Sequence, residues 1–331
     1  MSDSNRPIAP IASPAGPLDR RGFLARTAAA LAAAPLGKAI CANAAAAPYA
    51  FAHGAFEITV LSDGHFVLPP PGVAADVGFL YPATPRAELE AFLRGAGLSI
   101  ERVELPNNVV LIRAASELVL VDTGAGSGWQ PTAGRLVENL RVAGIDPAAI
   151  TKVVFTHAHP DHLWGVADEG GALRFPNASD LVAEREWNFW MAEDTASKLP
   201  ESFRRFALGA RRDLSRIKDR LQTVKAGADI GGGMRVVDTA GHTPGHISLE
   251  LAGGDGLIVV GDVAANAVVS FAHPEWRFAI DTVPELAITT RRRLLDRAAS
   301  EKTRLIGSHW PYPGLGLAER KDGAYRFVAT S

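Results

Sequence analysis

One stretch of the chain, residues 156–165 (THAHPDHLWG), places three histidines and an aspartate within six residues. It follows directly after the apolar run 150–155, ITKVVF, which is typical of a buried strand. Neutral imidazole and carboxylate groups bind zinc and similar divalent ions, and ligands that are close in sequence cost little chain entropy to gather. The stretch therefore predicts a metal site at the end of a strand. The alternative is a solvated loop that is rich in histidine.

The ligand-type side chains of this motif fall into two pairs. His157 and His159 can point the same way from an extended segment, because alternate residues share a face there. Asp161 and His162 come after the turn that Pro160 favours. The motif therefore divides naturally between two ions.

Three further polar motifs follow predicted strands later in the chain. GHTPGH, residues 241–246, follows MRVVDT; GDV, residues 261–263, follows LIVV; and GSHW, residues 307–310, follows RLI. These motifs and the first one hold six of the nine histidines. Loops at strand ends converge on a crevice in α/β folds, so we expect the four motifs to meet.

From residue 56 onward the pattern is that of an α/β domain without long low-complexity linkers. The segment 180–222 is predicted to be mostly helical, and a helix across 131–145 is expected to begin at Pro131 and end at Gly144. A last helix is predicted over 284–300. Alternating or apolar runs predict strands in 56–64, 108–124 (two strands with a polar bend), 150–155, 234–239, 247–253, 256–263, 303–310 and 324–330. This order favours two similar halves, packed sheet to sheet with helices outside.

The first 47 residues differ from the rest. Paired Arg20 and Arg21 precede a weakly hydrophobic, alanine-rich stretch, and this pattern resembles a twin-arginine export signal. The alternative is a disordered N-terminus with a short helix. The stretch is well short of the ~20 apolar residues of a spanning helix, so we expect no stable membrane anchor. We therefore expect residues 1–47 to be a signal read by the twin-arginine (Tat) machinery, residues 48–331 to be the folded domain, and the protein to be periplasmic or secreted.

Charge and cysteine content narrow the classes of ligand. The 331 residues carry a formal net charge of -2, so no basic surface indicates nucleic acid as a partner, and a small, roughly neutral molecule fits better. Cys41 is the single cysteine. Cleavage of the signal would remove it and leave neither a disulfide nor a thiolate ligand.

In their order, the motifs HxHxDH, GHTPGH, GD and SH resemble those of the metallo-β-lactamase fold superfamily. The resemblance covers about residues 56–331 and implies an αβ/βα sandwich of two mixed β-sheets with helices on the outer faces. It also implies a site for two divalent metal ions, with Zn²⁺ as the expected metal, in the groove between the halves. The residues that it assigns are His157, His159 and His246 at one ion, Asp161, His162 and His309 at the other, and Asp262 as the bridge.

The resemblance assigns supporting roles to two more residues. His242 would be a structural histidine that hydrogen-bonds nearby loops. Asp122, in VDTG, would accept a hydrogen bond from a ligand histidine. A turn-forming aspartate is the alternative for Asp122.

Two divalent ions lower the pKa of a shared water toward ~7, which gives a metal-bridging hydroxide at neutral pH. Asp161 and Asp262 would then be the catalytic carboxylates, and no nucleophilic serine or cysteine is needed. This chemistry hydrolyses esters, lactones, thioesters, amides or phosphoesters. The metal motifs do not choose among them.

A closer resemblance is to methyl parathion hydrolase and its lactonase-like and arylesterase-like relatives. It includes the segments LVDTGAG, PTAGRLVENLRVAG, REWNFW and GLGLAERKDGAYRFV. It implies neutral aryl esters, lactones or phosphotriesters as substrates. Trp129, Trp190 and Phe206 are the expected pocket residues, with packing in the core as the alternative for each.

Several other hypotheses about the function stay open. β-Lactamases are disfavoured. Class B1 and B2 enzymes use a cysteine ligand, which the mature chain lacks, and class B3 enzymes generally lack the bridging aspartate that Asp262 would supply. Acyl-homoserine lactonases place a tyrosine in the helical insertion, and no tyrosine occurs between Tyr81 and Tyr312. A glyoxalase II-like thioesterase, a metal-dependent binding protein and a structural zinc site are further alternatives. Homodimers are common among the resembling enzymes, so a homodimer is possible here.

Overall fold

The computed structural model describes residues 46–70 and 75–330. The predicted twin-arginine signal and Cys41 lie outside these residues, apart from the last two positions of the signal. Within the described part of the chain, no helix is long and apolar enough to cross a membrane.

The first sheet is mixed. Its strands run antiparallel from β1 to β4 and parallel from β4 to β7. The order across the sheet follows the sequence: β1 (Tyr49–His53), β2 (Phe56–Leu68), β3 (Val103–Ala114), β4 (Glu117–Val121), β5 (Lys152–Val154), β6 (Ser179–Ala183) and β7 (Leu221–Val224).

The second sheet is also mixed. Its parallel pair is β10 with β11, and its other neighbours are antiparallel. The order is β13 (Ala324–Ala329), β12 (Leu315–Lys321), β11 (Arg304–Gly307), β10 (Leu257–Gly261), β9 (Ile247–Leu251) and β8 (Met234–Asp238).

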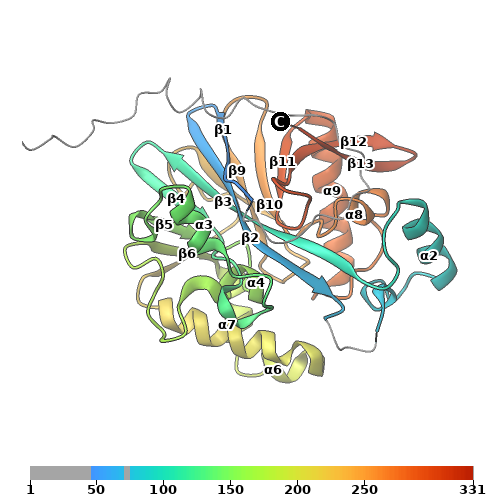
Figure 1. Ribbon diagram of the computed structural model, residues 1–331, viewed down its shortest axis with the longest axis horizontal. Helices are drawn as coiled ribbons and strands as arrows, with labels where there is room; N and C mark the ends of the chain where they lie inside the picture. Colours follow the sequence, from blue (N-terminus) through green and yellow to red (C-terminus); the bar gives the residue numbers. More distant parts are fainter. Residues whose placement is uncertain (1–45, 71–74, 331) are drawn as a thin grey trace, which may run out of the picture. The chain divides into compact units, whose positions relative to one another are not determined.

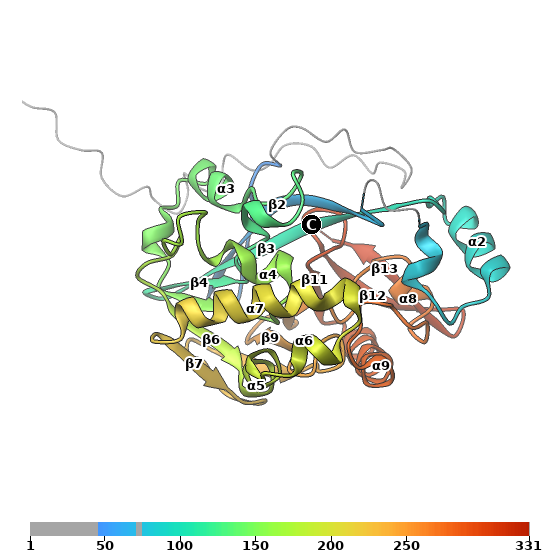
Figure 2. The same ribbon diagram turned by 90° about the horizontal axis from the view of Figure 1, so that it is seen from below.

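Helices flank the two sheets (Figures 1 and 2). The longer ones are α2 (Arg86–Gly95), α3 (Leu136–Val142), α5 (Glu184–Met191), α7 (Arg204–Ile217) and α9 (Pro284–Glu301). Single turns or short helices are η1 (Val77–Leu80), η2 (Gly126–Gly128), η3 (Pro147–Ala149), α4 (Pro160–Leu163), η4 (Trp164–Val166), α6 (Thr195–Lys198), η5 (Glu201–Phe203) and α8 (Val269–Ala272).

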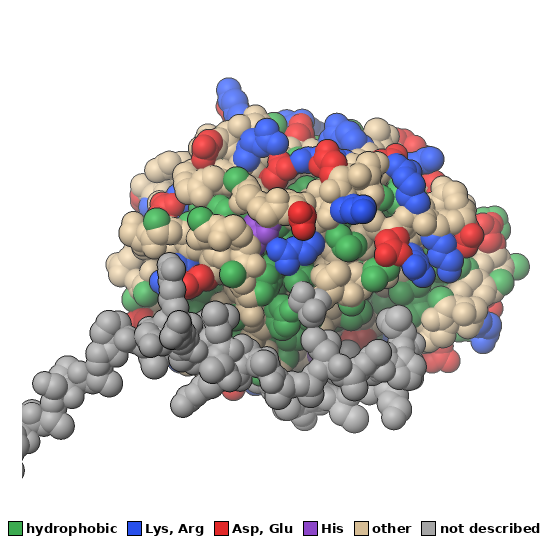
Figure 3. Space-filling view, turned by 90° about the horizontal axis from the view of Figure 1, so that it is seen from above, with side chains coloured by type: hydrophobic (Ala, Val, Ile, Leu, Met, Phe, Trp, Pro, Cys, Tyr) green, Lys and Arg blue, Asp and Glu red, His purple; other side chains and the backbone are tan. Residues whose placement is uncertain are grey.

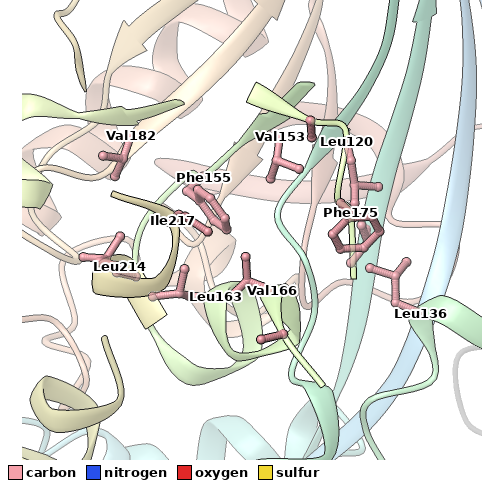
Figure 4. Packing of buried hydrophobic residues seen from close by; sticks show 14 of the residues in the cluster. Leu120, Leu136, Val153, Phe155, Leu163, Val166, Phe175, Val182, Leu214 and Ile217 are labelled. Atoms are coloured by element: carbon pink, nitrogen blue, oxygen red, sulfur yellow. The ribbon is translucent and has the colours of Figure 1, made fainter. Parts of the chain in front are cut away.

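Separate apolar layers hold the sheets and helices together. The inward faces of the two sheets share one layer, in which Val60 and Ile112 pack with Val236 and Leu249. The outer face of the first sheet packs on α3, α4 and α7 (Figure 4). The outer face of the second sheet packs on α9 through residues such as Leu295. The predicted αβ/βα sandwich of two mixed sheets is thereby confirmed.

Two predicted elements differ from the structure. The helix expected from Pro131 begins only at Leu136, because the backbone N–H groups of Gly134 and Leu136 donate to the buried carboxylate of Asp63 and hold the preceding loop there. The segment 180–222 contains the predicted helices, but its two ends add β6 and β7 to the sheet. Those strands are short, and the helical pattern between them dominates the sequence.

One face of the molecule carries basic and acidic side chains in close alternation (Figure 3). On the described part of this face, Lys and Arg side chains do not merge into one continuous patch.

Candidate metal centre

The polar motifs meet where strands of both sheets end. The first motif follows β5, residues 239–246 join β8 to β9, Asp262 follows β10, and His309 follows β11. The side chains that come together are all buried, each at most 6% exposed: His157, His159, Asp161, His162, His242, Asp262 and His309.

These seven side chains form two clusters. His157, His159 and His242 offer nitrogen atoms within 4.8 Å of one another, and so do the ligand atoms of the second cluster, Asp161, His162, Asp262 and His309. In the first cluster, Nε2 of His242 lies 2.9 Å from Nδ1 of His159. In the second, Nε2 of His309 lies 3.3 Å from Oδ2 of Asp161.

Asp262 lies between the two clusters. Its Oδ2 is 3.4 Å from Nε2 of His242 on one side and 3.0 Å from Nε2 of His309 on the other. Its Oδ1 is 3.4 Å from Nε2 of His162. A single carboxylate in this position is able to bind both ions of a pair.

The donor set fits divalent metal ions. Four buried ligand atoms lack a hydrogen-bond partner: Nε2 of His157, Oδ2 of Asp161, Nε2 of His162 and Oδ1 of Asp262. Leaving such groups buried without a partner is costly, and it is costliest for charged ones. Cations bound between the clusters would satisfy these atoms together.

Electrostatics favours the ligand forms of His157, His159 and Asp262. Burial, together with the neighbouring histidines, holds the pKa of His157 and of His159 well below the usual value, so both imidazoles are neutral. Burial opposes ionisation of Asp262, but the charges of His309 and His162 outweigh it and hold the pKa of this carboxyl well below its usual range. Neutral imidazole and carboxylate are the forms that bind metals. Burial opposes protonation of His162 and His309, but the carboxylates of Asp161 and Asp262 outweigh it and raise the pKa of both histidines, which would release a proton on binding a metal.

The structure reverses the roles predicted for His242 and His246. Nδ1 of His246 hydrogen-bonds Oγ1 of Thr239 at 2.9 Å, and its Nε2 accepts from the backbone N–H of Asp262 at 3.0 Å. Both ring nitrogens are therefore engaged within the protein, and His242 takes the place beside His159. The difference follows from the positions of the two histidines. His246 directly precedes β9, and its side chain contacts the backbone of residues 261 and 262, whereas His242 lies in the turn between β8 and β9.

Asp122 supports the second cluster. Its Oδ2 lies 2.8 Å from Nδ1 of His162, and its two oxygens also accept from the backbone N–H and the hydroxyl of Thr156. The contact leaves Nε2 of His162 free to face Asp161 and Asp262. The structure thus places Asp122 as an acceptor behind a ligand-type histidine, and its backbone has a positive φ of 66°.

Two residues that the sequence motifs did not reveal support His242. Nδ1 of His242 is 2.9 Å from Oδ1 of Asp281, and the other oxygen of Asp281 accepts from the buried guanidinium of Arg291 at 2.8 Å. Arg291 also donates to the carbonyl of Val263, next to Asp262. One buried arginine therefore connects the surroundings of His242 with those of the bridging carboxylate.

Glu186 is a third support that the motifs did not reveal. Its carboxylate accepts from the backbone N–H of Ala158, which separates His157 from His159, and from the indole of Trp190. It also accepts from the Thr243 hydroxyl and the Gly245 N–H in the turn after His242. The signal available in the sequence was a glutamate among the aromatic residues of REWNFW, since a charge in such apolar surroundings needs partners.

A cavity of about 400 Å³ opens onto the clusters, and His159, Asp161, His242, Asp262 and His309 line its base. Most of its wall is apolar: Phe66, Leu68, Pro69, Pro70, Ala75, Phe79, Leu105, Trp129, Phe203, Phe206, Ala265, Phe278, Ala279 and Ile280. A more open hollow of about 620 Å³ lies beside α3, between Val137 and Pro176, away from both clusters. We therefore place the substrate in the first cavity.

Trp129 and Phe206 line this cavity, as the sequence indicated, but Trp190 does not. Trp190 is 1% exposed, donates to Glu186 and packs behind His159, with ring centroids 5.7 Å apart. It belongs to the core layer under α7. The prediction of Trp190 as a pocket residue is wrong, because the face of α5 that carries it turns toward the core.

Comparison with known proteins agrees with this geometry. A model of the metallo-beta-lactamase superfamily matches residues 102–309. The uncharacterized protein YobT of Bacillus subtilis is 25% identical over 201 residues, which are 59% of this chain and 80% of that protein. The N-acyl homoserine lactonase AttM of Azorhizobium caulinodans is 33% identical over 120 residues, 34% of this chain and 40% of that protein.

Two solved structures are similar over most of the chain. AidC, a dizinc quorum-quenching lactonase, is 28% identical with a TM-score of 0.79, and the match covers 86% of this chain and 98% of AidC. The hydrolase AbOPH is 30% identical with a TM-score of 0.78, and the match covers 87% of this chain and 99% of AbOPH. With the family model, the sandwich and a dinuclear divalent metal site in agreement, this chain is a metal-dependent hydrolase that belongs to the metallo-beta-lactamase superfamily.

Proposed function

We propose that the protein hydrolyses neutral aryl esters and lactones at a pair of Zn²⁺ ions, with phosphotriesters as a second activity. The observation that carries this proposal is the apolar cavity whose base is formed by both ligand clusters. Such a wall suits an aryl or acyl group, and it has few polar groups for a charged substrate core. The likeness to methyl parathion hydrolase in sequence motifs supports the same substrate range.

The residues around the metals would hold and orient the reacting groups. Divalent ions held by the two clusters would supply a water that is acidic enough to react at neutral pH and would stabilise charge on the attacked oxygen. Asp262 sets the spacing of the two clusters, and Asp161 and His309 fix the second one. Phe66, Trp129 and Phe206 would exclude water from the side on which the apolar part of the substrate lies.

An acyl-homoserine lactonase is a second candidate within this range. AttM is named as an N-acyl homoserine lactonase and AidC as a quorum-quenching lactonase, and both names support a lactone as the substrate. The apolar wall would accept an acyl chain as readily as an aryl ring. Hydrolysis of dihydrocoumarin and phenyl acetate, compared with N-hexanoyl-homoserine lactone, distinguishes the two candidates.

Replacement of Asp262 by alanine tests the proposed function. We expect D262A to lose hydrolysis of phenyl acetate and dihydrocoumarin while its circular dichroism spectrum stays that of the wild type. Asp296→Ala is the matched control, because Asp296 lies on α9 in an exposed pair with Arg320 and should change nothing. Unchanged turnover in D262A would refute the bridging role.

We also propose that residues 1–47 direct export by the twin-arginine pathway, so that the folded enzyme works outside the cytoplasm. The paired Arg20 and Arg21 support this. Lysine at both positions should keep the full chain in the cytoplasmic fraction. Export of that variant at the wild-type level would contradict the proposal.

A further inference from the structure

The cavity has one charged side chain in its described wall apart from the ligand-type residues at its base. That side chain is Arg205, near the start of α7, and the neighbouring Ser202 is the remaining polar one. Every other described wall residue is apolar. A single cationic side chain on an otherwise largely apolar cavity wall is a candidate binding group for an anionic part of a ligand.

Arg205 is held in a defined place. Its guanidinium carbon lies 5.0 Å from the ring centroid of Trp129 and 5.4 Å from that of Trp164. Such cation–π contacts restrict a long side chain without using up its hydrogen-bond donors. A long contact of 3.5 Å from Nη2 to the carbonyl of Gly128 adds to this.

Two other arginines of α7 already have carboxylate partners. Arg204 contacts Glu201 at 2.5 Å, and Arg212 contacts Asp213 at 2.6 Å. Among residues 46–70 and 75–330, no carboxylate lies within ion-pair distance of Arg205. Its donors are therefore available to a molecule in the cavity.

A chain of aromatic contacts connects Arg205 with the metal centre. Trp129 contacts Phe66 at 6.0 Å and Phe206 at 5.4 Å between ring centroids. Phe66 in turn lies 5.1 Å from His309, and Phe206 lies 5.4 Å from His159. An aryl ring against these three side chains would have its ester end at the ligand clusters and its opposite end at Arg205.

We propose that Arg205 is a specificity-determining residue that selects aryl esters with an anionic group on the ring, remote from the scissile bond. The proposal rests on the proposed function and extends its substrate class, because the reacting ester group stays neutral and a substituent on the aryl ring carries the charge. In the reaction, water adds its oxygen to the acyl carbon, and the bond from that carbon to the aryl oxygen breaks. One proton of the water ends on the aryl oxygen, so the products are a carboxylic acid and a phenol whose anionic group is unchanged. The charge on the ring is recognised and takes no part in the chemistry.

The size of the effect follows from the exposure of Arg205, which water reaches. Exposed ion pairs are weak and are screened by salt, so we expect kcat/KM for the anionic ester to exceed that for the neutral ester by about two- to fivefold at low ionic strength. The preference should shrink toward one in 0.5 M salt. A purely steric effect would not respond to salt.

The test compares 4-acetoxybenzenesulfonate with phenyl acetate as substrates of the metal-loaded mature protein. Sulfonate is chosen because it is a poor metal ligand and so reports on Arg205. Arg205→Met should lower the kcat/KM ratio of the two esters by about two- to fivefold, and Arg205→Lys should keep part of this preference. Arg204→Met is the matched control on the same helix and should keep the wild-type ratio.

Binding of the product, 4-hydroxybenzenesulfonate, is measured separately by calorimetry, with phenol for comparison. Tighter binding of the sulfonate that R205M loses supports the proposal even if the wild type hydrolyses neither ester, in which case the proposed function alone fails. A wild type without preference for the sulfonate, or an R205M variant that keeps it, overturns the assignment of Arg205.

Discussion

His242 and Asp262 face each other across the two ligand clusters, with Nε2 of the histidine 3.4 Å from Oδ2 of the carboxylate. His246 contacts the backbone of the same residue, and its Nε2 accepts a hydrogen bond from the backbone N–H of Asp262 at 3.0 Å. The first histidine of GHTPGH thus contacts the metal-binding side of Asp262, and the second holds its backbone.

This difference predicts that replacing His242 lowers the metal content of the protein and that replacing His246 does not. His242→Ala should reduce the metal content from about two ions per chain to about one, because the first cluster loses one of its three nitrogen ligands. His246→Ala should keep about two ions but lose about 1–3 kcal/mol of stability, since the N–H of Asp262 is left unpaired. Elemental analysis and chemical unfolding check both. Loss of metal in H246A alone would reverse our assignment.

The contact of Asp281 with His242 predicts a variant that binds metal more weakly. Asp281→Asn removes the charge that orients His242 and pairs with Arg291, so metal affinity should fall by about 10- to 100-fold. Competition with a chromogenic chelator measures this without turnover. Arg292→Met, at an exposed position beside Arg291, is the control and should match the wild type. An unchanged metal affinity in D281N would contradict the role of Asp281 in orienting His242.

Trp190 and Phe206 should respond differently to truncation. Trp190→Ala removes a fully buried indole and should lower the free energy of unfolding by about 3–5 kcal/mol. Phe206→Ala opens the cavity wall and should mainly raise KM for aryl esters. Chemical unfolding and steady-state kinetics separate the two. If W190A were as stable as the wild type with a raised KM, Trp190 would be a pocket residue after all.

His53 predicts a pH dependence of stability far from the metal centre. It is 2% exposed, its Nδ1 accepts from Arg304, and burial lowers its pKa below the usual value of 6.5. A histidine whose pKa is lowered by folding stabilises the protein above pH 6.5, and this contribution is lost as the pH falls below that value.

The stability difference between wild type and His53→Gln should therefore be larger at pH 7.5 than at pH 5. Urea unfolding of both proteins at both pH values measures it, and the comparison cancels the effects of metal release that the two proteins share. A difference that grows toward pH 5 would mean that His53 is charged in the folded state.

The sequence predicted the parts of the site that are local. Residues 157–162 lie together in the chain, and the strand before them was clear from its apolar run, so this part of the clusters could be inferred from spacing. Asp262 and His309 each follow a predicted strand, and the resemblance in motif order assigned them to the metal site. The sandwich architecture came from the resemblance in motif order.

The parts that the sequence did not predict depend on distant contacts or on side-chain direction. His242 and His246 are chemically identical and four residues apart, and the start of β9 decides which one faces the groove. Asp281 and Arg291 form no motif, since the fold alone brings them to His242. The direction of Trp190 likewise depends on how α5 packs, which the aromatic pattern of REWNFW does not show.

The most direct test of a dinuclear hydrolase is the metal content of the purified mature protein, measured together with turnover of phenyl acetate and dihydrocoumarin. Two clusters joined by Asp262 predict about two divalent ions per chain, loss of turnover after chelation and recovery with Zn²⁺. Fewer than one ion per chain, in folded protein supplied with metal, would contradict the account.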